Sequence, residues 1–268
     1  MRIGFVEARD RTNFFAAIAA RLSSHEIFWL IENHAYALNH LTNVTKLRYP
    51  RHRDLATAPL DDPLLQRVAR SDRAVVYFKQ STAHYAWYLR QIEAWFDRVR
   101  PDVIFGEVSS FQAHITALVA ERRGVPFLNP MSSRYPTGRF AFFRGDRMIP
   151  LGGDPTPIDE QWLEQTLDDI VHSRTAPDYM TIRHSPIRKF LTRTRMSLEW
   201  LRGERYNLQS PFSFFQRGSA RDTARAEWEA ISESESRGGR PTNSSQRPRI
   251  LYPLQMQPEV NLDVWGRE

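Results

Sequence analysis

Two glutamates stand directly after predicted buried strands, in a position from which a carboxylate can reach a bound ligand. Glu7 ends the apolar run of residues 3–7, and Glu107 follows the run DVIFG, with Ser109 and Ser110 beginning the next helix. Because ligands of open α/β sheets bind outside the carboxyl ends of the strands, we expect these side chains to border a cleft. Burial there would raise the pKa of Glu107 toward that of a general base, so Glu107 is predicted to be catalytic. Glu7 and Ser109 are predicted to bind substrate.

Both glutamates also have simpler interpretations that need no ligand. Glu107 could serve only as a negative charge near a helix N-terminus, which contributes about 0.3–1 kcal/mol. Glu7 could be a solvated loop residue, as strand-end glutamates commonly are. These alternatives predict different degrees of burial, which a structure can distinguish.

A third polar segment follows the predicted strand at residues 125–129. It carries Arg134 and Arg139, which flank a Tyr-Pro-Thr-Gly turn that should hold the loop stiffly. Two arginines on one rigid loop would suit a sugar carboxylate or phosphate, although both could be ordinary surface residues. His84 and His114 lie in predicted helices, and we expect hydrogen-bonded structural roles for them.

Several kinds of chemistry find no support in the sequence. The chain has no cysteine, which excludes disulfides, zinc–thiolate sites and a cysteine nucleophile. No carboxylate or histidine cluster has metal-ligand spacing, so no metal site is predicted. A glycine-rich phosphate loop and a G-x-S-x-G elbow are also missing from the sequence.

The elements that would position these residues read as an α/β fold with a parallel sheet. Strands alternate with helical patterns along the first 130 residues, and residues 140–150 predict a hairpin turning at Arg144, Gly145 and Asp146. Thr12 or Asn13 is a candidate cap for the first helix. The predicted strands are residues 3–7, 26–32, 44–49, 102–106 and 125–129.

The segment 63–100 is helical in character. Asp62 is a candidate N-cap with Pro63 at the first helical position, and Pro101 should end the segment. A further helix is expected from about residue 111 to 123, with Gly124 as its cap. An apolar face is predicted on the long helix from the spacing of Tyr85, Tyr88, Ile92 and Trp95.

Composition divides the chain into four predicted parts. A Rossmann-like N-terminal domain spans 1–155, a helical, arginine-rich extension 156–231, a flexible low-complexity linker 232–249, and the opening strand of a second domain 250–268. The apolar strand at 250–254 has no partners in its own segment. We therefore expect the second domain to be truncated.

Charge and hydropathy suggest partners and location. The net charge is +6, and only three of the 37 basic residues are lysines. Arginine pairs well with phosphates and carboxylates, although codon bias alone could explain its abundance. Residues 183–225 could contact an anionic membrane or polyanion, or simply form surface helices. With no nucleic-acid motif, signal peptide or apolar spanning segment, we expect a cytoplasmic protein, with peripheral contact at the inner membrane as an option.

The C-terminal segment YPLQMQPE, residues 252–259, followed by DVWG, resembles a motif of capsule and surface-polysaccharide biosynthesis glycosyltransferases. It is most similar to the family that includes bacterial β-Kdo transferases. That resemblance implies a GT-B-like architecture of two Rossmann-like domains, with the glycan acceptor bound mainly by the first and the nucleotide sugar by the second. Gln257 would then bind substrate and Glu259 would be catalytic in the interdomain cleft. Alternatively, Pro258 and Glu259 only begin a helix.

The sequence departs from that family in two places. It has no His-Pro dipeptide, which the family carries on its nucleotide-binding side, and Gln255 stands where the family has histidine. The resemblance therefore implies a glycosyltransferase, or a truncated half of one, that is inactive as an isolated chain. Its substrates would be a glycan acceptor and a nucleotide-activated sugar, CMP-linked donors among them, with no further cofactor. The alternatives are a non-catalytic or degenerate glycan-binding accessory protein and a sugar-nucleotide epimerase of similar build.

Overall fold

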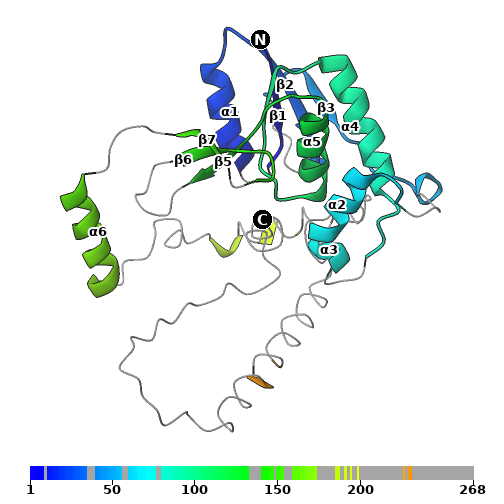
Figure 1. The fold of residues 1–268 in the computed structure, drawn as a ribbon. Coiled ribbons are helices and arrows are strands. Elements are labelled where there is room, and N and C mark those ends of the chain that lie inside the picture. The colour runs from blue at the N-terminus through cyan, green and yellow to red at the C-terminus, as the bar shows by residue number, and fades with distance from the viewer. Residues whose placement is uncertain are drawn as a thin grey trace.

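The computed structural model describes residues 1–8, 11–34, 40–55, 60–76, 80–132, 140–147, 149–153 and 159–173, together with a few isolated positions between 185 and 230. Its described strands form one sheet of seven, in the order β3-β2-β1-β4-β5-β6-β7 (Figure 1). The five strands from β3 to β5 are parallel, and β6 and β7 continue the sheet antiparallel. The strands are β1 (Arg2–Val6), β2 (Glu26–Ile31), β3 (Val44–Lys46), β4 (Val103–Phe105), β5 (Phe127–Ser132), β6 (Phe140–Arg144) and β7 (Pro150–Gly153).

Helices cover both faces of the sheet, and each face has its own apolar core (Figure 1). On one face, Phe15 and Ala19 of α1 (Thr12–Arg21) pack on Ile3 and Phe5 of β1. On the other face lie α2 (Pro63–Ser71), α4 (Tyr85–Val99) and α5 (Phe111–Arg122). The predicted α/β fold is therefore confirmed, and its arrangement is consistent with a Rossmann-like domain.

The start of α1 differs from the sequence prediction. Arg11 occupies the N-cap position with helical backbone angles, and no side chain caps the helix. Thr12 already lies in the first helical turn, where its hydroxyl accepts a hydrogen bond from the backbone N–H of Ala8 at 3.2 Å. The prediction that Thr12 or Asn13 caps this helix is wrong, because the hydroxyl secures the preceding loop instead.

The helical segment predicted from 63 to 100 contains three described helices, α2, α3 (Arg73–Val76) and α4. Asp62 caps α2 through its carboxylate, which accepts a hydrogen bond from the Leu64 N–H at 2.8 Å, as predicted. The break after α2 is made by Asp72, which accepts from the N–H of Ala74 and from the hydroxyl of Tyr85. The predicted apolar face of α4 is confirmed by the complete burial of Tyr85, Tyr88, Ile92 and Trp95.

The helix α5 packs tightly behind β4 and β5. Its first ten residues are all buried, and Ser110 caps it by accepting from the N–H of Ala113 at 2.8 Å. Gly106, which follows β4, lies close to Phe127 of β5, because a Cβ there would lie 2.5 Å from Cζ of Phe127. Gly124 follows the helix with a φ of 69°, as expected for a glycine that ends a helix.

The predicted hairpin is present as β6 and β7, with Gly145 in the turn at a φ of 57°. Beyond it, α6 (Glu160–Ser173) exposes Trp162, Leu163 and Leu167 and contains no lysine or arginine. Among the described helices, none is both long enough and apolar enough to cross a membrane. The predicted linker 232–249 and the segment 250–268 lie outside the described residues.

Candidate functional site

Glu7 lies just beyond the end of β1 and is held by the neighbouring strand. Its backbone N–H donates to the carbonyl of Leu30 at 2.9 Å, and its carboxylate accepts from the N–H of Asn33 at 2.8 Å. Glu7 and Asn33 are each only 3% exposed. A solvated loop glutamate is therefore the wrong interpretation of Glu7, because the turn after β2 folds over its carboxylate.

Glu32 is a second buried carboxylate, and it was not among the site residues predicted from the sequence. It directly follows β2 and is 3% exposed. The hydroxyl of Ser110 donates to its Oε2 at 2.6 Å, so the turn after β2 is tied to the N-terminus of α5. The signal that could have found Glu32 was its place at the end of an apolar strand, the same feature that identified Glu7 and Glu107.

Glu107 follows β4 and faces Arg11 from the loop after β1. Its carboxylate lies 3.2 Å from the guanidinium of Arg11, and the two side chains are 15% and 52% exposed. Burial raises the pKa of Glu107 above its usual value, while the charge of Arg11 opposes that rise. Ser109 lies in the adjacent turn, where its N–H donates to the carbonyl of Glu107 at 2.8 Å.

The strand order brings these three carboxylates to one edge of the sheet. The chain leaves β1 for β2 and β3 on one side and returns to β4 and β5 on the other, so the order reverses between β1 and β4. Pairing of Phe5 with Phe105 places Glu7 and Glu107 two residues further along on either side of this reversal. Such a switch point is where open α/β sheets bind their ligands.

The charge of this edge selects for hydroxyl groups over phosphates. Glu7, Glu32 and Glu107 are acceptors when ionised. Within the described residues, Arg11 pairs with Glu107, whereas Glu7 accepts from a backbone N–H and Glu32 from a serine hydroxyl. The turn after β1 reads EARDR, so it has no glycine to let a phosphate approach the backbone. Polyhydroxylated ligands, which donate hydrogen bonds to carboxylates, suit this edge better than dinucleotides.

Four predicted site residues cannot be placed. Arg134, Arg139, Gln257 and Glu259 lie outside the described residues, so their roles stay predictions. Within the described ranges, no group of three or more His, Asp or Glu side chains could hold a metal ion.

A second polar cluster lies away from this edge and joins α2, α5 and the turn between β6 and β7. His114 Nε2 lies 2.8 Å from Oδ2 of Asp146, and its Nδ1 lies 3.2 Å from Oγ of Ser71. The order Ser–His–Asp is that of a hydrolytic triad, but Ser71 is buried and its hydroxyl donates to the carbonyl of Val68. Arg67 also binds both oxygens of Asp146 at 2.8 Å. The cluster is structural, and the predicted hydrogen bonding of His114 is confirmed.

His84 is buried among aromatic rings. It contacts Tyr85, Tyr88 and Phe111 edge to face, with ring centroids 4.9–6.2 Å apart. Burial lowers the pKa of His84 to about 4, so the imidazole is neutral near pH 7. A neutral histidine in this position packs the core between α4 and α5.

No protein-family model, curated protein or solved structure matches the chain. What this edge of the sheet can do therefore follows from its own geometry. It presents a mostly buried carboxylate of raised pKa, Glu107, paired with Arg11 at a switch point.

Proposed function

We propose that this domain is the acceptor side of a GT-B-like glycosyltransferase of bacterial surface-polysaccharide biosynthesis, with Glu107 as its general base. The observation that carries the proposal is the burial of Glu107 at the switch point between β1 and β4, which raises its pKa. A base works best when its pKa approaches the working pH, because it is then both ionised and strongly proton-accepting. An exposed helix-terminal glutamate would gain no such shift.

The neighbouring groups support a carbohydrate acceptor. Glu7 and Glu32 bring two further carboxylates to the edge of the sheet that carries Glu107, and Ser109 lies in the turn after Glu107. Sugars present several hydroxyls that donate to carboxylates and also accept from amides and hydroxyls. Since carboxylates repel phosphates, the nucleotide part of a donor would bind elsewhere, as the resemblance to two-domain transferases implies.

In the proposed reaction, Glu107 accepts the proton of an acceptor hydroxyl as its oxygen attacks the anomeric carbon of a nucleotide-activated sugar. The bond from that carbon to the nucleotide phosphate breaks, and the nucleotide leaves with the bonding electrons. Arg11 keeps the carboxylate ionised before the reaction because it pairs with it at 3.2 Å. By resemblance, Gln257 and Glu259 would line the interdomain cleft. Arg134 and Arg139, on the loop that the sequence predicts to be rigid, would contact a carboxylate or phosphate of the substrate.

A transfer assay tests this function. Because the resemblance implies that the isolated chain is inactive, the purified chain would be completed with a nucleotide-binding domain of the resembled family. The completed protein would be incubated with surface-polysaccharide oligosaccharides and a panel of nucleotide sugars, CMP-Kdo among them, and products would be detected by mass spectrometry. Glu107→Gln should lower the transfer rate about 10²–10⁴-fold, while acceptor binding measured by NMR changes much less. Glu164→Gln, an exposed change on α6, removes the same charge and should leave the rate unaltered.

The second candidate is a non-catalytic glycan-binding protein, which the ion pair between Glu107 and Arg11 favours, since a paired carboxylate is a weaker base. Glycan binding that Glu32→Gln weakens, without transfer from any donor, would establish that candidate. If no oligosaccharide binds the wild-type chain, both functions are wrong.

A further inference from the structure

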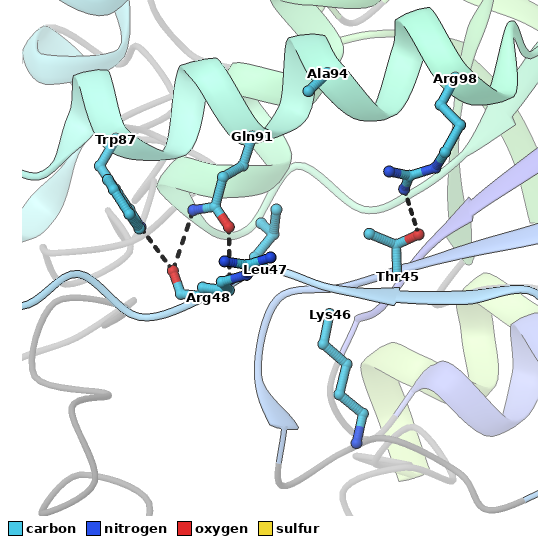
Figure 2. Close-up of a pocket in the computed structure, with 8 residues that line it drawn as sticks. All are labelled: Thr45, Lys46, Leu47, Arg48, Trp87, Gln91, Ala94 and Arg98. Carbon is cyan, nitrogen blue, oxygen red and sulfur yellow. Dashed lines mark hydrogen bonds between the residues drawn. The ribbon is translucent and has the colours of Figure 1, made fainter.

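A separate pocket of about 240 Å³ lies between the edge strand β3 and the helix α4 (Figure 2). It is smaller than the roughly 300–1,000 Å³ typical of drug-sized ligands, so its size suits a single sugar ring or a comparable molecule. One wall comes from β3 and the residues after it, and the other from one face of α4. The lining residues are Thr45, Lys46, Leu47, Arg48, Trp87, Gln91, Ala94 and Arg98.

The walls of this pocket are fixed by hydrogen bonds between side chains and backbone. The side-chain amide of Gln91 accepts from the N–H of Arg48 at 2.7 Å and donates to its carbonyl at 3.1 Å. The indole N–H of Trp87 donates to the same carbonyl at 2.8 Å, and Leu47 is buried beneath. The pocket is thus preorganised, which lowers the entropy lost when a ligand binds.

Charges on α4 are segregated between its two sides. On the side facing α5, Glu93 pairs with Arg122 at 2.9 Å and Asp97 pairs with Arg123 at 2.5 Å. On the side facing β3, Arg98 donates to the hydroxyl of Thr45 at 2.9 Å and forms no ion pair within the described residues. The acidic side chains of the helix are therefore turned away from the pocket.

The lining itself carries three cations and no carboxylate among the described residues. In Figure 2, Arg98 reaches down from α4 to Thr45, whereas the ammonium of Lys46 points away from the helix. Arg98 is therefore the principal cation on the α4 wall. One of its five N–H donors contacts Thr45, which leaves the guanidinium oriented but able to bind an anion.

We propose that this pocket binds an acidic monosaccharide, with its phosphate or carboxylate on Arg98 and its ring beside Ala94 and Gln91, which lie one and two turns before Arg98 on α4. The methyl group of Ala94 supplies an apolar contact for the carbon side of a sugar ring, and the guanidinium supplies paired donors for an oxyanion. The site is distinct from the carboxylate edge and does not depend on the glycosyltransferase proposal. Its charge is opposite, so the two sites select different parts of a glycan.

Isothermal titration of the full chain with glucose 1-phosphate, glucuronate and glucose tests the proposal. The two anions should bind and glucose should bind at least about fivefold more weakly, and the tighter anion identifies which acidic group the pocket prefers. Arg98→Gln should weaken anion binding about fivefold, and Arg48→Gln should weaken it in the same direction. Added salt should weaken binding as well.

The matched control is Arg21→Gln, which removes one positive charge from the exposed last turn of α1. Anion binding unchanged in this variant, together with a loss in Arg98→Gln, supports the pocket. Equal losses in both variants would show attraction by overall charge, and equal binding of glucose and the anions would show no acidic-group recognition. Either result, or no anion binding by the wild-type chain, overturns the proposal.

Discussion

Replacing Asp146 with asparagine removes the charge that holds the turn between β6 and β7 against α2 and α5. In the wild-type chain, Arg67 Nη2 contacts both carboxylate oxygens of Asp146 at 2.8 Å, and His114 Nε2 contacts Oδ2 at 2.8 Å. The asparagine side chain has the same shape but one fewer acceptor oxygen and no charge. The NH₂ group would then face donors of Arg67 or His114.

The size of the effect follows from the burial of these contacts. Hydrogen bonds to charged groups contribute about 1.5–3 kcal/mol each, but exposed ion pairs contribute about 0–1 kcal/mol. The side chain of His114 is 5% exposed and that of Asp146 is 9%, so their hydrogen bond should contribute the full amount expected for a charged group. The side chain of Arg67 is 40% exposed, so its ion pair with Asp146 should contribute no more than an exposed pair does. We expect Asp146→Asn to lower the free energy of unfolding by about 2–4 kcal/mol.

The effect should also depend on pH. Burial alone would raise the pKa of Asp146, but the hydrogen bond and charge of His114 and the charge of Arg67 lower it overall. A depressed carboxyl pKa gives stability that is present above the unfolded pKa and lost as pH falls through the folded pKa. The difference in free energy of unfolding between wild type and Asp146→Asn should therefore be largest at pH 7. It should shrink as the pH falls below 3.8, the ordinary pKa of an aspartate.

Urea denaturation followed by far-UV circular dichroism measures this difference at pH 7 and at lower pH. Asp61→Asn is the matched control, because Asp61 is exposed and lies in the loop before α2. It should change the free energy of unfolding by less than about 0.5 kcal/mol. If Asp146→Asn lowers the free energy of unfolding by less than about 1 kcal/mol at pH 7, the buried contact between His114 and Asp146 contributes little and the prediction is wrong.

Three further substitutions test other parts of the structure. Glu107→Gln should preserve or raise thermal stability at pH 7, because burial raises the pKa of the wild-type carboxyl and ionising it there opposes folding. In differential scanning calorimetry, any increase in melting temperature should disappear below pH 4.5, the ordinary pKa of a glutamate. A variant that melts at a lower temperature than the wild type at pH 7 would contradict the net effect of burial. Gly106→Ala should lower the free energy of unfolding by about 1–3 kcal/mol, because its Cβ would lie 2.5 Å from Cζ of Phe127. An unchanged midpoint of urea denaturation would disprove the close approach. Ser110→Ala should lower the free energy of unfolding by about 1–2 kcal/mol, because it removes the α5 cap and the contact with Glu32. Ser110→Thr keeps the hydroxyl and should retain most of the wild-type stability in the same measurement. A loss as large as that of Ser110→Ala would contradict the role of the hydroxyl.

The sequence predicts the fold well where local signals suffice. Buried strands appear as short apolar runs bounded by glycine, proline or charge, and the run ending at Glu107 is a clear example. The hairpin around Gly145 and the cap at Asp62 also follow from local chemistry. The missed break at Asp72 has a local part, the hydrogen bond from the N–H of Ala74, and a longer-range part, the contact with Tyr85 thirteen residues away, which no local propensity encodes.

The candidate site was only partly predictable for the same reason. Glu7 and Glu107 could be named because each follows its own strand. Glu32 and Asn33 gain their roles from the pairing of β2 with β1 and from the hydroxyl of Ser110, 78 residues along the chain. Such long-range pairings decide which carboxylates are buried, and a single sequence does not reveal them.

The hydrogen bonds of Gln91 and Trp87 to Arg48 have a consequence for how the molecule behaves in a crowded solution. β3 is an outer strand of the sheet, and such strands offer N–H and carbonyl groups on which another chain can add a strand and begin to aggregate. Beyond β3, the N–H and carbonyl of Arg48 are already occupied by the amide of Gln91, which imitates the backbone of a neighbouring strand. A chain approaching this margin would have to displace α4 before it could extend the sheet past Arg48.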